Sequence, residues 1–155
     1  MTPNKITNHS TFKKSVYTET IINAPIEKVW RELTNFKEMP TWSKSLQKIE
    51  GALKKNGQTE VHFMDNKGKV GIYKHLLIHF EEGKLFGWSD PFILGIIDNH
   101  KYQLEKISEN QTKLIQSDEA KGIATLFMGN FIMNFFLKSY TEFNHTLKTR
   151  IEKNN

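Results

Sequence analysis

The 155-residue sequence contains no cysteine and only four prolines. Without cysteine the chain cannot form a disulfide bond, a thiolate metal site or a cysteine nucleophile, and such a composition fits a reducing compartment. We therefore expect a cytoplasmic location. Apolar residues make up 37% of the chain and charged residues 25%. This balance excludes a disordered or low-complexity protein and predicts a chain that builds its own core.

Long hydrophobic runs are also missing. A membrane-spanning helix needs about 18 or more apolar residues in succession. The longest candidate, GIATLFMGNFIMNFFL at 122–137, is shorter and contains Asn130 and Asn134. The N-terminal stretch MTPNKITNHSTFKKS has no apolar segment of the secretory kind. The sequence thus predicts no transmembrane segment, and transient contact with a membrane surface stays open. We expect residues 1–14 to form a flexible N-terminal segment and residues 15–153 to form one domain.

The charge and motif content excludes several functional classes. The formal net charge is +5, from 22 Lys and Arg against 17 Asp and Glu. The lysines are spread along the whole chain, and no RRM, KH or helix-turn-helix pattern is visible, so we predict a solvated basic surface and no nucleic-acid partner. The sequence also lacks a serine elbow, a Walker loop and a dinucleotide-binding glycine pattern. We expect no cofactor.

The first part of the chain predicts a strand followed by one or two short helices. Residues 15–23, SVYTETIIN, are rich in β-branched side chains and end before Ala24-Pro25, which indicates a strand. In the next stretch, PIEKVWRELTNF, the apolar residues recur at helical spacing after a proline at the first helical position. KEMPTW at 37–42 predicts a turn or a second short helix. Trp30 and Trp42 are expected to anchor these helices to the core.

The rest of the chain predicts a meander of strands and then one long helix. Between 43 and 121, short alternating runs are separated by turn signals such as Asn56-Gly57 and Glu82-Gly83, which favours antiparallel pairing. After Gly122 the chain has no proline and one further glycine, Gly129. This composition predicts a helix that continues to about residue 152.

The order of these elements resembles the START-like superfamily, also called SRPBCC, and its polyketide cyclase/dehydrase and lipid-transport branch. The stretches that carry the resemblance are INAPIEKVWRELTNFKEMPTW, DNHKYQLEK, TKLIQSDEAKG and FNHTLKTRIE. The resemblance covers residues 15–153 and implies an α+β helix-grip fold. In that fold a curved, seven-stranded antiparallel sheet wraps around the C-terminal helix, with two short helices between strands 1 and 2. It also implies an elongated apolar cavity between sheet and helix, which serves as the functional site.

Strand alternation selects the polar side chains that should face this cavity. His100 and Tyr102 share one face of their expected strand, and Gln116 and Asp118 share one face of the next. If both faces point inward, the residue numbers of paired positions must sum to an even value, which requires a turn of odd length around residue 109. A sum of 218 then sets Tyr102 opposite Gln116 and His100 opposite Asp118. We therefore predict a contact between His100 and Asp118 as an imidazolium–carboxylate pair. Such a pair either satisfies itself as a polar plug, or orients a ligand or transfers a proton together with Tyr102.

The long helix has a surplus of aromatic residues at its start. Its ordinary core stripe includes Phe136, Tyr140 and Phe143, and a flank beside it carries Phe127, Phe131 and Phe135. We expect these three phenylalanines to guard the mouth of the cavity, although a second subunit or a membrane interface would also explain the surplus. The other residues predicted to line the cavity or its mouth are Phe63, Tyr73, Phe86, Trp88, Phe92 and Leu94.

The histidines at 75 and 79 have the HxxxH spacing of metal ligands on a helix. Here the two lie on a predicted strand, where a four-residue step spans about 13 Å, so one ion cannot bridge them. We expect no metal site.

Three functions agree with these features. The first is binding of a small hydrophobic or amphipathic ligand, such as a lipid, an isoprenoid or a polyketide-like compound, in the cavity. The second is a cyclase or aromatase that uses His100, Tyr102 and Asp118 as its acid and base groups. The third is a protein-interaction module that uses the outer surface. Either a monomer or a homodimer agrees with the sequence.

Overall fold

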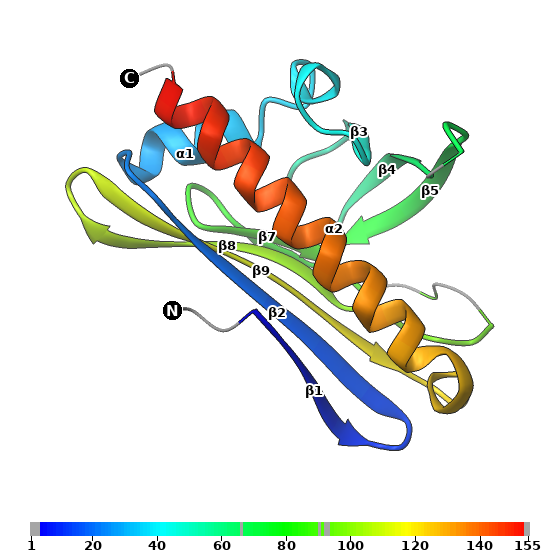
Figure 1. Cartoon of the computed structure of the whole chain (residues 1–155). Coiled ribbons are helices and arrows are strands. Elements are labelled where there is room, and N and C mark those ends of the chain that lie inside the picture. The colour runs from blue at the N-terminus through cyan, green and yellow to red at the C-terminus, as the bar shows by residue number, and fades with distance from the viewer. Residues whose placement is uncertain (1–3, 66, 90, 92–93, 154–155) are drawn as a thin grey trace.

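The structure, a computed structural model of the chain, describes residues 4–65, 67–89, 91 and 94–153. It has an α+β architecture, in which a long helix crosses one face of a bent antiparallel sheet (Figure 1). The strands are β1 (Lys5–Ser10), β2 (Lys13–Ile22), β3 (Leu46–Gly51), β4 (Gly57–Met64), β5 (Val70–Leu77), β6 (His79–Glu81), β7 (Leu85–Trp88), β8 (His100–Ser108) and β9 (Gln111–Lys121). The helices are α1 (Ile26–Leu33), the 3-10 helix η1 (Met39–Thr41) and α2 (Thr125–Lys153). The predicted helix-grip fold, with two short helices after the first long strand, is confirmed.

The strands form two sheets instead of the single seven-stranded sheet that we predicted. The larger sheet has the order β1-β2-β9-β8-β7-β6, and the smaller has the order β3-β4-β5. Two features account for the nine strands. The expected strand between 69 and 80 passes from one sheet to the other at Ile78, and residues 1–14, expected to be flexible, contain β1. In β1, Ile6 pairs with Val16 of β2.

The pairing of β8 with β9 follows the predicted register. Tyr102 lies opposite Gln116, and Leu104 lies opposite Leu114. All four side chains are buried. Because side chains alternate along a strand, this register places one polar and one apolar pair on the same concave face.

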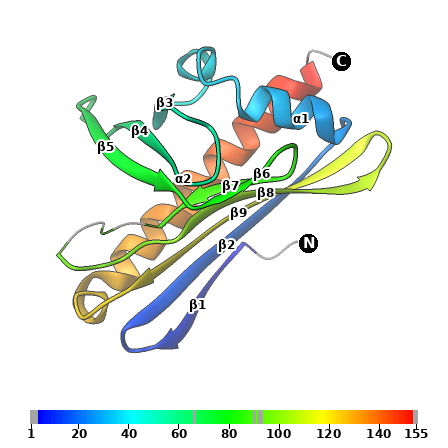
Figure 2. The ribbon, with the colours of Figure 1, turned by 180° about the vertical axis from the view of Figure 1, so that it is seen from behind.

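Helix α2 joins two groups of core residues. Its C-terminal half buries Phe143, Leu147 and Ile151 against α1 and the concave face of the larger sheet. Trp30 and Trp42 belong to this group, as expected. Its N-terminal half buries Ile132 and Met133, with other side chains, against β2, β9 and residue Ile96. Seen from behind, none of the described helices lies over the outer face of the larger sheet (Figure 2).

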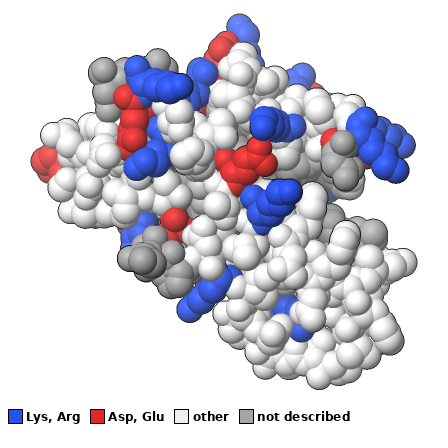
Figure 3. All heavy atoms as spheres, in the orientation of Figure 1, with Lys and Arg blue, Asp and Glu red and all other residues white. Residues whose placement is uncertain are grey.

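Charged side chains are unevenly distributed over the surface. Lys, Arg, Asp and Glu are mixed over much of the visible face, but a large lobe around the start of α2 is nearly free of them (Figure 3). No helix among the described residues is long and apolar enough to cross a membrane.

Candidate functional site

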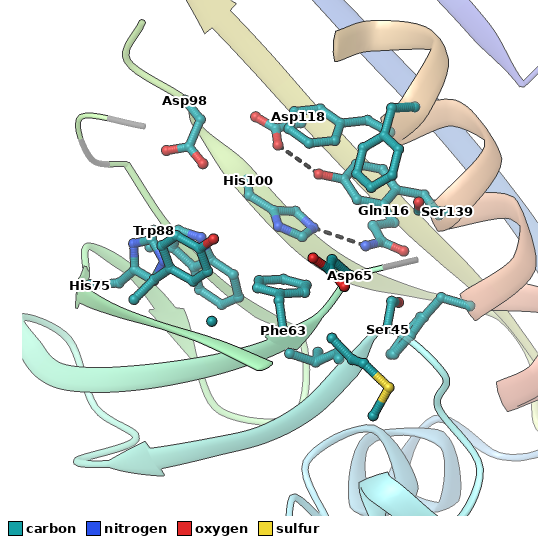
Figure 4. A pocket seen from close by; sticks show the side chains of 18 of the residues that line it. Ser45, Phe63, Asp65, His75, Trp88, Asp98, His100, Gln116, Asp118 and Ser139 are labelled. Atoms are coloured by element: carbon teal, nitrogen blue, oxygen red, sulfur yellow. Dashed lines mark hydrogen bonds between the residues drawn. The ribbon is translucent and has the colours of Figure 1, made fainter. Parts of the chain in front are cut away.

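A cavity of about 400 Å³ lies where the smaller sheet bends away from the larger one, beside the middle of α2 (Figure 4). A volume of this size holds a small organic molecule. Phe63, Met64, Gly71, Tyr73 and His75 line it from β4 and β5, and Trp88, His100, Tyr102, Gln116 and Asp118 from the larger sheet. Helix α2 contributes Phe135, Phe136, Ser139, Tyr140 and Phe143, and the remaining lining residues are Ser45, Leu46, Asp65, Lys69 and Asp98.

His100 and Gln116 form one polar contact on the inner wall. Nε2 of Gln116 lies 2.9 Å from Nε2 of His100, and both side chains are buried. Because the amide nitrogen of Gln116 can only donate, this contact requires an unprotonated Nε2 on His100. Burial lowers the pKa of His100 to about 3, in agreement with a neutral ring. The amide oxygen Oε1 of Gln116 has no hydrogen-bond partner in the described structure.

Asp118 and Tyr140 form a second polar contact. The hydroxyl group of Tyr140 donates to Oδ2 of Asp118 at 2.7 Å, and the backbone N–H of Asn99 donates to Oδ1 at 3.1 Å. Burial raises the pKa of Asp118 to about 6, while these hydrogen bonds oppose the rise. The pKa of Tyr140 also rises well above its ordinary value, through burial and the nearby Asp118. Tyr140 is therefore a stable donor to this carboxylate.

The predicted ion pair between His100 and Asp118 is wrong. Both residues lie on the concave face as expected, but His100 is neutral and contacts Gln116, while Asp118 receives the Tyr140 hydroxyl. The reason is the proximity of α2, which places Tyr140 against both groups. Its ring stacks on His100 with centroids 4.7 Å apart, and its hydroxyl reaches Asp118.

Aromatic rings form much of the rest of the wall. His75 of β5 stacks on Trp88 of β7 with ring centroids 5.3 Å apart, and Tyr73 stacks in turn on His75. These contacts bridge the gap between the two sheets. Trp88 is buried, whereas Tyr73 is 45% exposed. The stack therefore runs from the interior of the protein to its surface.

Two charged side chains mark the end of the cavity that opens to solvent. Among the described lining residues, they are the only charged ones that are exposed. Asp65 and Lys69, on either side of the β4–β5 turn, are both exposed. The backbone N–H groups of Lys67 and Lys69 donate to Oδ1 of Asp65, which fixes this turn. Phe135 lies 57% exposed on α2 and also lines the cavity. We infer that the mouth lies between this turn and α2.

Several residues predicted for the cavity or its mouth lie elsewhere. Phe127 and Phe131 are 81% and 74% exposed and do not line the cavity, because the rotation of 100° per residue turns them away from the sheet side of α2. Leu94 is also exposed. Phe86 is fully buried in the core, where it contacts Trp30. Phe92 lies outside the described residues.

The sequence pattern predicts a core position for the α2 residues of the cavity wall and does not predict that they line the cavity. Phe136, Tyr140 and Phe143 occupy the helical stripe that faces the sheet, and that stripe borders both the core and the cavity. Ser139 and Asp98 carried no periodic signal. His75 has a partial signal, since strand alternation places it on the same face as Tyr73.

The described residues contain one group with the chemistry of metal ligands, on the outer face of β3 and β4. The ligand atoms of Glu50, Glu60 and His62 lie within 4.8 Å of one another. Lys48 pairs with Glu50 at 2.5 Å and Lys74 with Glu60 at 3.6 Å, so lysines already compensate both carboxylates. His75 and His79 do not form a joint site, because they belong to different sheets and His79 contacts Asn99.

Comparison with known proteins agrees with this architecture. The sequence model of the family described as "Polyketide cyclase / dehydrase and lipid transport" matches residues 13–152. No curated protein sequence matches the chain at a significant level.

Solved structures share the fold at low sequence identity. A START superfamily protein from Mycobacterium smegmatis superimposes with a TM-score of 0.70 at 14% identity, over 91% of this chain and 99% of that one. The Zhui aromatase/cyclase from Streptomyces sp. R1128 has a TM-score of 0.68 at 11% identity, over 91% and 94%. Protein MLL2253 from Mesorhizobium loti has a TM-score of 0.68 at 16% identity, over 91% and 98%. At these identities the likeness concerns the fold.

Proposed function

Because the chain belongs to the polyketide cyclase / dehydrase and lipid transport family, we propose that its cavity binds one small hydrophobic or amphipathic molecule. The observation that carries this proposal is a cavity of about 400 Å³ whose wall is mostly aromatic and aliphatic, with a few polar groups at its inner end. Burial of apolar ligand surface at about 25 cal/mol per Å² would supply the affinity. The polar groups would set the orientation.

The inner wall supports a ligand that carries a hydrogen-bond donor. The Oε1 atom of Gln116 is a buried acceptor with no donor among the described residues, which is costly unless a bound molecule supplies one. A hydroxyl group on a ring or an isoprenoid chain would satisfy it. The apolar body of such a ligand would lie between the Trp88–His75 stack and Phe136 of α2.

One observation favours an enzymatic reaction as a second candidate. Asp118 is a cavity-lining carboxyl group with a pKa of about 6, so it exchanges a proton near neutral pH. In a cyclase or dehydratase, Asp118 would accept or donate the proton on a bound polyketone, and Tyr140 would stabilise its charged form. His100, neutral and hydrogen bonded to Gln116, would serve as a positioning group.

The test is native mass spectrometry of the freshly purified protein, followed by extraction and identification of any small molecule that leaves with it. We expect a stoichiometric apolar or amphipathic ligand in the wild type. Ser139→Trp, which fills the cavity from α2, should remove the extra mass, whereas His145→Trp on the exposed side of α2 should retain it. Equal ligand loss in both variants, or the same ligand retained in Ser139→Trp, would contradict the proposal. The extracted compound, incubated with wild type and Asp118→Asn, then tests for turnover.

A further inference from the structure

An apolar surface at the start of α2 lies mostly outside the cavity. Seven side chains on this surface are at least 49% exposed, and we call them the Phe patch: Leu94, Ile97, Ile123, Leu126, Phe127, Phe131 and Phe135. Four of them belong to the start of α2, around which the visible surface carries few charged side chains (Figure 3). Large exposed apolar patches on monomeric proteins mark a site of contact with another molecule.

The Phe patch is held by a fixed backbone frame. The backbone groups of Ile97 and Lys121 exchange two hydrogen bonds, which fasten the 94–97 segment to the end of β9. Gly122 follows with φ at +144°, and a Cβ atom there would lie 2.5 Å from the carbonyl oxygen of Gly95. Only glycine permits this close approach. The apolar loop and the first turn of α2 are therefore presented side by side.

The charges around the Phe patch are basic. Between Thr125 and Leu137, α2 carries no charged residue, and its next exposed residue is Lys138. Lys121 lies at the other end of the patch, beside Ile97. No acidic group among the described residues pairs with either lysine. The acids closest in sequence to the two lysines at the surface are paired elsewhere, Glu119 with Lys13 and Glu142 with Lys44. Asp98, next to Ile97, is buried.

We propose that the Phe patch docks on the surface of a lipid bilayer that contains anionic lipids. Phe127, Phe131 and Phe135 recur every four residues along one side of α2, so a helix lying in the plane of the interface can insert all three between the acyl chains. Lys121 and Lys138 then face the headgroup phosphates, which supply the missing negative charge. The anionic surface is thus complementary to the patch in both polarity and charge.

A second copy of the chain fits this surface less well. A two-fold interface places the same patch against itself, so the basic border of one copy meets the basic border of the other. The border has no free acidic group that could offset this repulsion among the described residues. Lipid phosphate supplies that charge and a second copy does not.

Phe135 connects the Phe patch to the cavity, because it belongs to both. Docking through the patch would bring the mouth of the cavity next to the bilayer. An apolar molecule could then move between bilayer and cavity with little contact with water. The docking proposal goes beyond the proposed ligand binding and does not require it, because Phe127 and Phe131 do not line the cavity.

The test is co-sedimentation of the full chain with vesicles of phosphatidylcholine containing one quarter phosphatidylglycerol. We expect binding that weakens with added salt and is much weaker on pure phosphatidylcholine. The double substitution Phe127→Ser and Phe131→Ser should lower the vesicle partition coefficient at least about tenfold. Ile72→Ser is the matched control, because Ile72 is 58% exposed on β5 and lies outside the patch, and it should leave partitioning unchanged. Lys121→Gln with Lys138→Gln should reduce binding only on the anionic vesicles.

Two further measurements keep the test decisive. Phe131→Trp should show a blue-shifted emission that brominated lipid quenches, against a wild-type background from three largely buried tryptophans. Sedimentation velocity without lipid gives the oligomeric state. A wild type that fails to bind anionic vesicles would overturn the proposal. A second result would also overturn it: a wild-type dimer that does not bind vesicles and that the double serine substitution converts to a monomer. In that case a second copy of the chain would occupy the patch.

Discussion

The hydroxyl group of Tyr140 donates a 2.7 Å hydrogen bond to Asp118, and the ring of Tyr140 stacks on His100. One residue of α2 therefore contacts two buried titratable groups of the cavity wall. Their pKa values move in opposite directions, with that of His100 lowered to about 3 and that of Asp118 raised to about 6. Between these values both groups are uncharged, so this pair of side chains is least costly to bury in mildly acidic solution.

We predict that Asp118→Asn changes how stability depends on pH. The folded pKa of Asp118, about 6, lies above its ordinary value of 3.8, so the folded state binds more protons between these limits and wild type loses stability as pH rises through them. The variant lacks this loss. Between about pH 4 and pH 7.5 its unfolding free energy should gain about 2 kcal/mol relative to wild type. Urea unfolding at both pH values measures the difference, and a constant difference would contradict it.

His100→Asn should have the opposite effect. Because the folded pKa of His100 is about 3 and its ordinary value is 6.5, wild type loses stability as pH falls through this range. The variant removes that loss, so relative to wild type it should gain about 3 kcal/mol between about pH 7.5 and pH 4. NMR titration of the His100 ring gives an independent check. A ring that protonates near pH 6.5 would show that the group is not desolvated.

Gln116→Leu tests the unpaired acceptor on the cavity wall. Leucine removes Oε1 at similar volume. We therefore expect a ligand that donates a hydrogen bond to this atom to bind at least about tenfold more weakly. In the free protein two effects oppose each other, because leucine removes a buried acceptor without a partner among the described residues and also removes the amide donor to Nε2 of His100. We therefore expect the free energy of unfolding to change by about 1 kcal/mol or less. Gln116→Glu is the matched comparison, since it keeps an acceptor at that position. Unchanged ligand affinity in Gln116→Leu would mean that the ligand does not contact Oε1.

Two phenylalanines that sequence reasoning placed together at the cavity should differ in their contribution to stability. Phe86→Ala opens a space in the core and should cost about 3 to 5 kcal/mol, because its side chain is fully buried. Phe131→Ala removes a side chain that is 74% exposed and should change stability by less than about 0.5 kcal/mol. Chemical denaturation of both variants gives the comparison, and a large cost for Phe131→Ala would place it in the core.

A chain that begins at Lys13 tests whether the domain folds without β1. Most of β1 is exposed, although Ile6 packs against the core and the side chain of Asn4 contacts Thr141. We expect a folded protein with a lower melting temperature. Removing β1 also exposes the edge of β2, which should increase aggregation. Loss of the folded state would show that β1 is part of the minimal domain.

The sequence was sufficient to predict the order of elements and the local register. The alternation in β8 and β9, together with the short turn between them, placed Tyr102 opposite Gln116 and Leu104 opposite Leu114. Alternation alone did not reveal that the run containing Ile78 is shared between two sheets. The residues before and after Ile78 show the same alternating pattern, so the sequence does not indicate that β5 and β6 belong to different sheets.

Periodicity decides which side of an element a residue occupies, and it decided this correctly for His100, Gln116 and Asp118. It does not decide what lies opposite that side, because the distance between a helix and a sheet depends on how all the intervening side chains pack. Tertiary structure therefore placed Tyr140 between His100 and Asp118, left Phe127 and Phe131 in solvent, and opened a cavity beside α2.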